Sequence, residues 1–562
     1  MTYTRSAHLA LAMLLVAGCD DAATPTGADL AAPADLAIAP DASLENAACE
    51  QALFAGWRAN LPSVGMASKG AAASYDAVIG KLMRDFGVPG GAVAVMKDGR
   101  LVFAKGYGFA DRDDPQLTHP DDLFRVASVS KQVTAAAILK LIEMGKLALD
   151  EKPFDILADL QPLPGKSRAP KLAAITIQNL LQHSGGWNRD STYDPMFRAP
   201  TIAAALGTMG PPDGNGIIRY MLDKAPTYDA GTTYCYSNFG YCVLGRIIER
   251  RGGLPYDQFV KQHVLGPLGA KRMALGRSFE DERADGEVRY YDYPGAPMAQ
   301  SVFPDRPGQV PWPYGGYSQE EMDANGGWIA SPIDLLRFQR SLDGRQPPAD
   351  ILAANSIAKM IENPLIPVYC TANGKTAAFA DVNAYWYGFG WQVNKYKNWW
   401  HTGSLPGTMT EVVRADNGFG WAAFFNTRPQ DSGGFINRLD QDLWTALNGA
   451  KNDWPTQDWF DQYDAFSPWL AEGDFAKAAD QARMTGLHAS RLEGRSAGGR
   501  KEFRAQWATV PPGTSFEAAI DLDCLSFEAA RARNDGAGAS LTNLQSFADG
   551  AGRRRFQAIW MK

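Results

Sequence analysis

Short segments rich in apolar residues and bounded by turn residues form two groups, one near each end of the first 450 residues. In the first group, residues 91–96 and 101–107 flank an Asp-Gly pair, which is typical of two strands joined by a tight hairpin turn. The second group consists of residues 391–396, 399–403, 410–415 and 420–426. We predict that strands from both ends of this region join in one antiparallel sheet.

The apolar spacing between and beside these strands is helical. Residues 74–86 have apolar side chains on one helical face and stop at Gly87, and residues 132–144 are apolar almost all round, as in a buried helix. The segment 125–338 is rich in helices and loops. The pattern predicts an α+β fold, an antiparallel sheet flanked by helices, with a second, mainly helical lobe and a groove between them.

The last hundred residues contain two imperfect copies of one pattern. Residues 475–507 align with residues 527–560, and each copy has a helix-like start, a glycine-rich turn and a terminal strand of the form Phe-x-x-x-Trp. We therefore expect residues 451–562 to form a small C-terminal repeat module. Structural packing is its simplest role, and ligand binding is the alternative.

The N-terminus has the pattern of an export signal. An apolar run over residues 9–17 follows Arg5, and it is too short to span a membrane as a mature helix. It ends in Leu-Val-Ala-Gly-Cys, which is similar to the lipobox of bacterial lipoproteins. That similarity implies a signal peptide over residues 1–18 and an exported, envelope-bound protein held at a membrane by lipidated Cys19. An ordinary secretory signal is the alternative. Residues 19–48, rich in Ala, Pro and Asp, predict a flexible tether before a globular domain over residues 49–450.

Composition narrows the set of partners. The 562 residues are 45% hydrophobic and 21% charged, which is typical of a globular protein of more than one domain. The formal net charge of −7 argues against a nucleic-acid partner. The six histidines have no metal-ligand spacing, so no metal or other cofactor is predicted.

Cysteine pairing stays open at this stage. Five of the six cysteines follow Cys19, and an odd number leaves at least one thiol unpaired. Cys235 and Cys242 would lie about 10 Å apart in a helix, too far for a disulfide without an irregular turn.

The first chemical motif is Ser128-x-x-Lys131, at the start of the buried helix 132–144. Free backbone N–H groups at a helix start stabilise a developing anion, and both side chains lie on one helical face. A buried lysine loses hydration, which lowers its pKa and allows it to accept the serine proton. Taken alone, a capping serine followed by a solvated lysine explains the pattern equally well.

The second motif is Tyr236-x-Asn238, followed by an apolar helix. Both side chains can point one way, so a partly ionised Tyr236 could pass the serine proton to the leaving group. Asn238 could hold a substrate amide and orient Lys131. The alternative is a capping turn with a core tyrosine.

The third motif is a strand that ends at a Pro-Gly turn and carries His401, Thr402, Gly403 and Ser404. We expect Gly403 to let a substrate backbone approach, and the amide of Ser404 to donate to an oxyanion beside the amide of Ser128. His401 could bond a substrate carboxylate or the Tyr236 hydroxyl. A histidine at a strand end without a catalytic role is the alternative.

In this order the three motifs resemble those of the serine β-lactamase and penicillin-binding protein superfamily, including class C type β-lactamases, DD-peptidases and their esterase relatives. The resemblance covers about residues 70–430. It implies a β-lactamase/transpeptidase-like fold and an acyl-enzyme on Ser128, with Lys131 and Tyr236 moving its proton. Asn238 and residues 401–404 would contact a small-molecule or peptide substrate, for which the cell wall is one candidate source. His183 would be structural.

One position departs from the class C pattern. Dedicated class C β-lactamases have lysine where this chain has His401, and a histidine is largely neutral at pH 7. The sequence therefore favours a peptidase or esterase. A β-lactamase, or a sensor that acylates with little turnover, is the alternative. Substrate choice is expected to depend on the loops 187–228 and 277–322.

Overall fold

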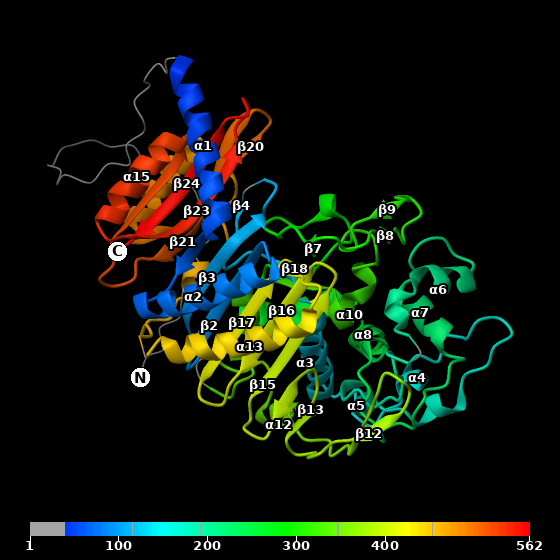
Figure 1. Ribbon diagram of the computed structural model, residues 1–562. Coiled ribbons are helices and arrows are strands. Elements are labelled where there is room, and N and C mark those ends of the chain that lie inside the picture. Colours follow the sequence, from blue (N-terminus) through cyan, green and yellow to red (C-terminus); the bar gives the residue numbers. More distant parts are fainter. Residues whose placement is uncertain (1–39, 115, 192, 346–347, 452) are drawn as a thin grey trace, which may run out of the picture.

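The computed structural model describes residues 40–562, apart from residues 115, 192, 346–347 and 452. Its centre is a nine-stranded antiparallel sheet that joins strands from both ends of the first 450 residues, as predicted (Figure 1). Along the main path the strands are β1 (Ser63–Met66), β3 (Arg100–Asp111), β2 (Gly90–Lys97), β17 (Phe419–Phe425), β16 (Thr408–Arg414), β15 (Trp399–Leu405), β14 (Gln392–Asn394) and β13 (Tyr385–Tyr387), and β4 (Gln116–Leu117) pairs with β3.

Helices cover both faces of this sheet because its central strands are apolar on both sides. On one face, α2 (Lys69–Phe86) and α13 (Ser432–Gly449) pack on a core that includes Phe103, Trp421 and Leu439. On the other face, α11 (Pro332–Arg340) lies against β2 and β17. Side chains of β17 point to both faces of the sheet. Trp421 packs in the core under α2 and α13, and Phe424 packs in the core on the opposite face.

The second lobe is mainly helical, and it lies beside the sheet (Figure 1). Its longest helices are α3 (Ser130–Glu143) and α8 (Asn238–Gly252), which contact one another. The shorter helices are α4 (Pro153–Ile156), α5 (Ile177–Leu181), α6 (Ala199–Leu206), α7 (Gly214–Met221), α9 (Tyr256–Val260), α10 (Asp323–Gly326) and α12 (Ala354–Met360). The small sheet β5 (Phe124–Arg125), β10 (Trp328–Ala330) and β6 (Ala274–Leu275) leads directly into the loop that carries Ser128.

The C-terminal residues form two small sheets of identical connectivity. The first has the strand order β19-β21-β20 and the second β22-β24-β23, and in each a helix follows the first strand in sequence. The elements are β19 (Leu470–Ala471), α14 (Glu472–Met484), β20 (Leu487–Ala497) and β21 (Arg500–Thr509), then β22 (Phe516–Leu522), α15 (Cys524–Gly536), β23 (Ser540–Ala548) and β24 (Arg554–Met561). The register shift after Ala489 in β20 recurs after Leu541 in β23, so the two copies share backbone irregularities as well as topology.

The N-terminal boundary differs from the predicted one. Residues 40–48, predicted as part of a flexible tether, begin helix α1 (Pro40–Asn60), because alanine-rich sequence also favours helix. Leu53 and Trp57 of α1 are buried in a core shared with the C-terminal module. The predicted signal peptide, Cys19 and the rest of the tether lie outside the described residues. No helix in the described part of the chain is long and apolar enough to cross a membrane.

Two disulfides answer the question of cysteine pairing. Cys49 of α1 bonds to Cys524 of α15, and Cys235 bonds to Cys370 of β11 (Val368–Cys370). Cys242 is a buried free thiol inside α8, so the Cys235–Cys242 pair that the spacing disfavoured does not form.

The module is joined to the sheet by a buried ionic cluster. Arg491 of β20 forms ion pairs with Asp121, Asp122 and Glu493, and its side chain is only 5% exposed. Burial alone would raise the pKa of Asp121, but the cations of Arg491 and Arg272 lower it to about 2. Such a cluster makes the position of the module specific, because the buried carboxylates of Asp121 and Asp122 pair with a cation that the module supplies.

Replacing Arg491 with methionine tests this dependence. We expect Arg491→Met to lower the free energy of unfolding by about 3–5 kcal/mol, because buried carboxylates lose their partner. The control is Arg495→Met, which removes an exposed pair with Glu502 and should cost about 1 kcal/mol or less. Urea denaturation measures both, and equal effects of the two substitutions would contradict the assigned role of Arg491.

Candidate active site

Ser128 lies in a single 3-10 turn (Ala127–Val129) directly before α3, not within the α-helix itself. The preceding residue, Ala127, is fully buried and has a φ of 48°, which is unfavourable for a residue with a side chain. The Thr410 hydroxyl of β16 donates to the Val126 carbonyl over 3.1 Å and holds this turn against the sheet. The serine is thus presented by a strained and well-anchored loop.

Lys131 occupies the first turn of α3 and is completely buried. Its Nζ donates to Asn238 Oδ1 over 2.7 Å and to the Asn325 carbonyl over 2.6 Å, and it lies 3.2 Å from Ser128 Oγ. A neutral amine has two N–H donors and one lone pair. The two oxygens take both donors, so the lone pair of a neutral Lys131 is directed at the Ser128 hydroxyl.

The electrostatic surroundings favour that neutral amine. Burial lowers the pKa of Lys131 well below its usual value, and the cation of Arg189 lowers it further, while the carboxylate of Asp194 opposes the shift. The prediction that burial would turn this lysine into a base is consistent with its surroundings.

Tyr236 lies beside the same amine, with its ring centre 4.9 Å from Lys131 Nζ. Burial raises its pKa well above that of a free phenol, although Arg189 and the Ser128 hydroxyl act in the opposite direction. The prediction of a partly ionised Tyr236 is therefore wrong for this state, because the phenol stays protonated at neutral pH. Its hydroxyl is buried and has no hydrogen bond of normal geometry among the described residues, so it is available to donate.

Asn238 performs one of its two predicted roles in the structure, since it orients Lys131. Its amide nitrogen also donates to Asp194 Oδ2 over 2.6 Å. One N–H of the amide remains, so contact with a substrate amide stays a prediction. Asp194 was not predicted from the sequence, although its position before a proline, where it caps a short helix, is a recognisable pattern.

His401 forms its hydrogen bonds within the protein and not with Tyr236. Its Nδ1 donates to the Thr402 carbonyl over 2.6 Å, because a carbonyl only accepts, and its Nε2 then accepts from the Tyr387 hydroxyl over 3.0 Å. Burial lowers the pKa of His401 to about 3, so it is neutral at pH 7. The predicted bond to Tyr236 is not present, and a ring with both nitrogens bonded inside the protein leaves none for a substrate carboxylate.

His183 completes the interior of the site. It is buried, its Nδ1 accepts from the Ser237 amide over 3.1 Å, and its ring lies 4.1 Å from that of Tyr236. Burial lowers its pKa well below the usual value. These contacts agree with the predicted structural role.

The packing of β15 against its neighbours leaves no room for a side chain at Gly403. A Cβ at this position would lie 2.4 Å from the Val126 carbonyl oxygen and 2.2 Å from Thr410 Oγ1. The close approach is therefore between β15 and the serine loop, in addition to any approach by a substrate. The predicted roles of Thr402 and of the Ser404 amide stay predictions.

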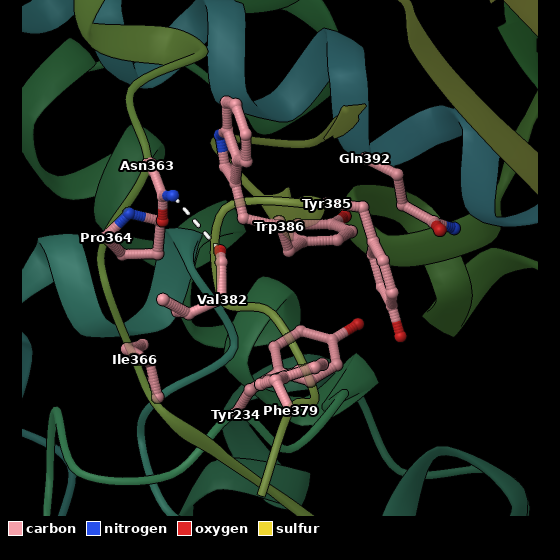
Figure 2. Close-up of a pocket in the computed structure, with 10 residues that line it drawn as sticks. Tyr234, Asn363, Pro364, Ile366, Phe379, Val382, Tyr385, Trp386 and Gln392 are labelled. Atoms are coloured by element: carbon pink, nitrogen blue, oxygen red, sulfur yellow. Dashed lines mark hydrogen bonds between the residues drawn. The ribbon is translucent and has the colours of Figure 1, made fainter. Parts of the chain in front are cut away.

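Tyr387, which bonds to His401, also lines an aromatic hollow. Figure 2 shows other residues of its lining, among them Tyr234, Phe379 and Tyr385. The rings of Tyr234 and Phe379 lie 6.3 Å apart at its base, and Tyr385 approaches Phe379 edge-on. Apart from Tyr234, the residues that line this hollow belong to the segment 363–392. The Cys235–Cys370 disulfide and a hydrogen bond from the Tyr234 amide to the Val368 carbonyl link this segment to the second motif. No cluster of His, Cys, Asp and Glu in the described residues could hold a metal ion.

Comparison with known proteins identifies the family. The family model described as Beta-lactamase matches residues 75–443, which include Ser128, Lys131, Tyr236 and His401. The chain belongs to the Beta-lactamase family. It therefore stands among the serine hydrolases of the β-lactamase and transpeptidase superfamily.

Individual relatives of this family member have several names. Esterase EstB of Burkholderia gladioli is 31% identical over 229 residues, which are 39% of this chain and 55% of the esterase. A putative D-alanyl-D-alanine carboxypeptidase of Escherichia coli O157:H7 is 29% identical over 194 residues, 33% of this chain and 43% of that protein. The chain thus spans about half the length of these curated relatives.

A solved structure shows the same fold. The D-amino acid amidase from Ochrobactrum anthropi SV3, in complex with L-phenylalanine, has a TM-score of 0.50 and 22% identity over 68% of this chain and 98% of the amidase. The fold is β-lactamase/transpeptidase-like, with additional small sheets in the C-terminal region.

Substitution of Gly403 tests the close approach of β15. We expect Gly403→Ala to lower kcat/KM at least about tenfold and stability by about 1–3 kcal/mol, because the serine loop must shift to admit the methyl group. Gly433→Ala is the control, since its Cβ would meet only one atom, 3.9 Å away. Ester hydrolysis and thermal unfolding measure both effects, and a fully active Gly403→Ala enzyme would contradict the geometry.

The pH profile tests the state of Lys131. Because the neutral amine is the active form and its pKa is lowered, activity should be present well below the usual lysine pKa and lost as the pH falls through the lowered value. His401 titrates at about 3, and so it contributes no step between pH 5 and 8. The dependence of kcat/KM on pH from 4 to 11 measures this, and a rate that rises only near the usual lysine pKa of about 10.4 would contradict it.

Proposed function

We propose that this protein is an acyl-transferring hydrolase that forms a covalent ester on Ser128 and releases the acyl group to water. The observation that carries the proposal is the bonding of Lys131, whose two donors are taken by oxygens and whose lone pair faces the serine. A lysine arranged in this way is a base for one particular hydroxyl.

In the first step Ser128 Oγ attacks the substrate carbonyl while its proton moves to Lys131 Nζ. The C–O or C–N bond to the leaving group then breaks, and the leaving atom receives a proton from the Tyr236 hydroxyl, which is reprotonated from Lys131. A water molecule attacks the resulting ester by the same route in reverse. Its proton passes to Lys131 and then to Oγ, which regenerates the serine and releases a carboxylic acid.

Esters and peptide-like amides are the favoured substrates. The relatives are named as an esterase and a putative D-alanyl-D-alanine carboxypeptidase. His401 is neutral and bonded within the protein, so the third motif supplies no positive charge of the kind that a lysine there would supply. This supports a peptidase or esterase over a β-lactamase, and cell-wall peptides are one source of such substrates.

We also propose that the chain is exported and anchored by lipid at Cys19. The lipobox-like sequence supports this, and so do the two disulfides, because disulfides persist mainly in oxidising compartments. A membrane surface would then be the partner of the N-terminus.

Active-site labelling tests the proposed function. Purified protein and Ser128→Ala are incubated in parallel with a fluorophosphonate, a fluorescent penicillin and a chromogenic thioester. We expect thioester turnover and fluorophosphonate labelling in the wild type only, with loss of about 10³-fold or more in Ser128→Ala. Persistent penicillin labelling without turnover would indicate a sensor, and rapid penicillin loss a β-lactamase. Equal behaviour of the two proteins would refute all of these functions.

A further inference from the structure

Arg189 lies at the edge of the site, in the loop over residues 187–228 that was expected to influence substrate choice. Its guanidinium carbon is 4.5 Å from the centre of the Tyr236 ring. Its side chain is 38% exposed, so one side contacts the catalytic phenol and the other faces solvent. A ligand bound to Ser128 would therefore be within reach of this cation.

The hydrogen-bonding capacity of Arg189 is unused by the described residues. A guanidinium has five N–H donors, and here Nε is buried without a hydrogen bond. The nearest carboxylate is that of Asp190, 3.4 Å from Nε and 56% exposed. A solvated pair between adjacent residues contributes little, so it does not compete strongly with a ligand.

The other basic groups around Ser128 are buried. Burial lowers the pKa of Lys131, His183 and His401, which disfavours a positive charge on each of them. Arg189 is thus the permanent cation in contact with Tyr236. It also lines an open hollow of about 490 Å³, together with Arg198, Phe197 and the two acidic residues Asp190 and Asp194. Asp194 is bonded to the Asn238 amide, and Asp190 is largely exposed.

We propose that Arg189 binds a carboxylate of the substrate and thereby selects anionic substrates. The inference rests on the proposed acyl-transfer function and names the substrate class of that same site. A planar guanidinium matches a carboxylate with two parallel hydrogen bonds, an arrangement that a neutral ester cannot reproduce. Arg189 would supply from the helical lobe the charge that His401 does not supply from β15.

The carboxylate could belong to either part of the substrate, and two matched pairs of N-acyl-D-alanine thioesters distinguish the sources. The first pair differs in the acyl cap, succinyl or butyryl, with one thiol leaving group. The second pair keeps one cap and differs in the leaving thiol, mercaptoacetate or its methyl ester. Release of thiol gives kcat/KM for each substrate with the full-length protein.

We expect the wild type to favour the anionic member of one pair about 10- to 100-fold, the range of a charge-assisted hydrogen-bonded contact. Arg189→Gln should reduce that ratio to about threefold or less, and Arg189→Lys should restore part of it. The ratio is the correct readout, because loss of the Arg189 charge also raises the pKa of Lys131 and affects both substrates alike. Arg495→Gln is the control, because Arg495 is an exposed arginine of the C-terminal module, and it should leave the ratio unchanged.

Three results are distinguishable. No preference in either pair, or an Arg189→Gln enzyme that loses activity equally on both members, overturns the inference and leaves Arg189 as a support for the Tyr236 ring. Hydrolysis of neutral and anionic thioesters that depends on Ser128 would preserve the proposed function in that case. Absence of Ser128-dependent hydrolysis for all four thioesters refutes both the proposed function and the inference that rests on it.

Discussion

The rest of the site depends on a primary amine that is buried among neutral groups. Lys131 contacts an amide oxygen, a backbone carbonyl and a hydroxyl, and none of these carries a charge. Burying an ammonium in such surroundings would cost several kcal/mol, so the group gives up its proton instead. Asp194, the closest carboxylate in this network, reaches the amine only through the Asn238 amide. Because no carboxylate contacts Lys131 directly, its amine is not fixed in an ion pair and can accept the proton of Ser128.

The larger architecture serves to bring three segments to that amine. The serine turn rests on β15 and β16, where Gly403 and Thr410 permit and fix its position. The second motif starts α8, which packs on α3 through the helical lobe. Asn325 comes from α10, near the small sheet that leads into the serine turn. The helical lobe and the serine turn therefore supply the atoms of the proton path, and the sheet fixes the position of that turn.

Much of this could be predicted from local sequence, because the relevant patterns are short. The hairpin at Asp98-Gly99, the buried helix after Lys131 and the two repeats follow from periodicity and turn residues, and all are present. What could not be predicted came from contacts between distant segments. Asn325 binds Lys131 through its backbone carbonyl, and no residue pattern predicts such a contact. Nothing in the sequence distinguishes Tyr387 from the other tyrosines, and only the fold reveals its hydrogen bond to His401. Helix α1 was missed because alanine-rich composition fits both a tether and a helix, and only packing against α15 decides between them.

The bond between Cys49 and Cys524 has a consequence for the topology of the whole molecule. It joins two cysteines 475 positions apart and closes a covalent ring that contains the complete catalytic region and most of the repeat module. A protease that cuts one exposed loop inside this ring opens it without separating the two pieces, which stay linked through sulfur. The ring also fixes α1, the first helix that the structure describes, beside α15 of the module, so a force applied to α1 is transmitted to the second repeat (Figure 1).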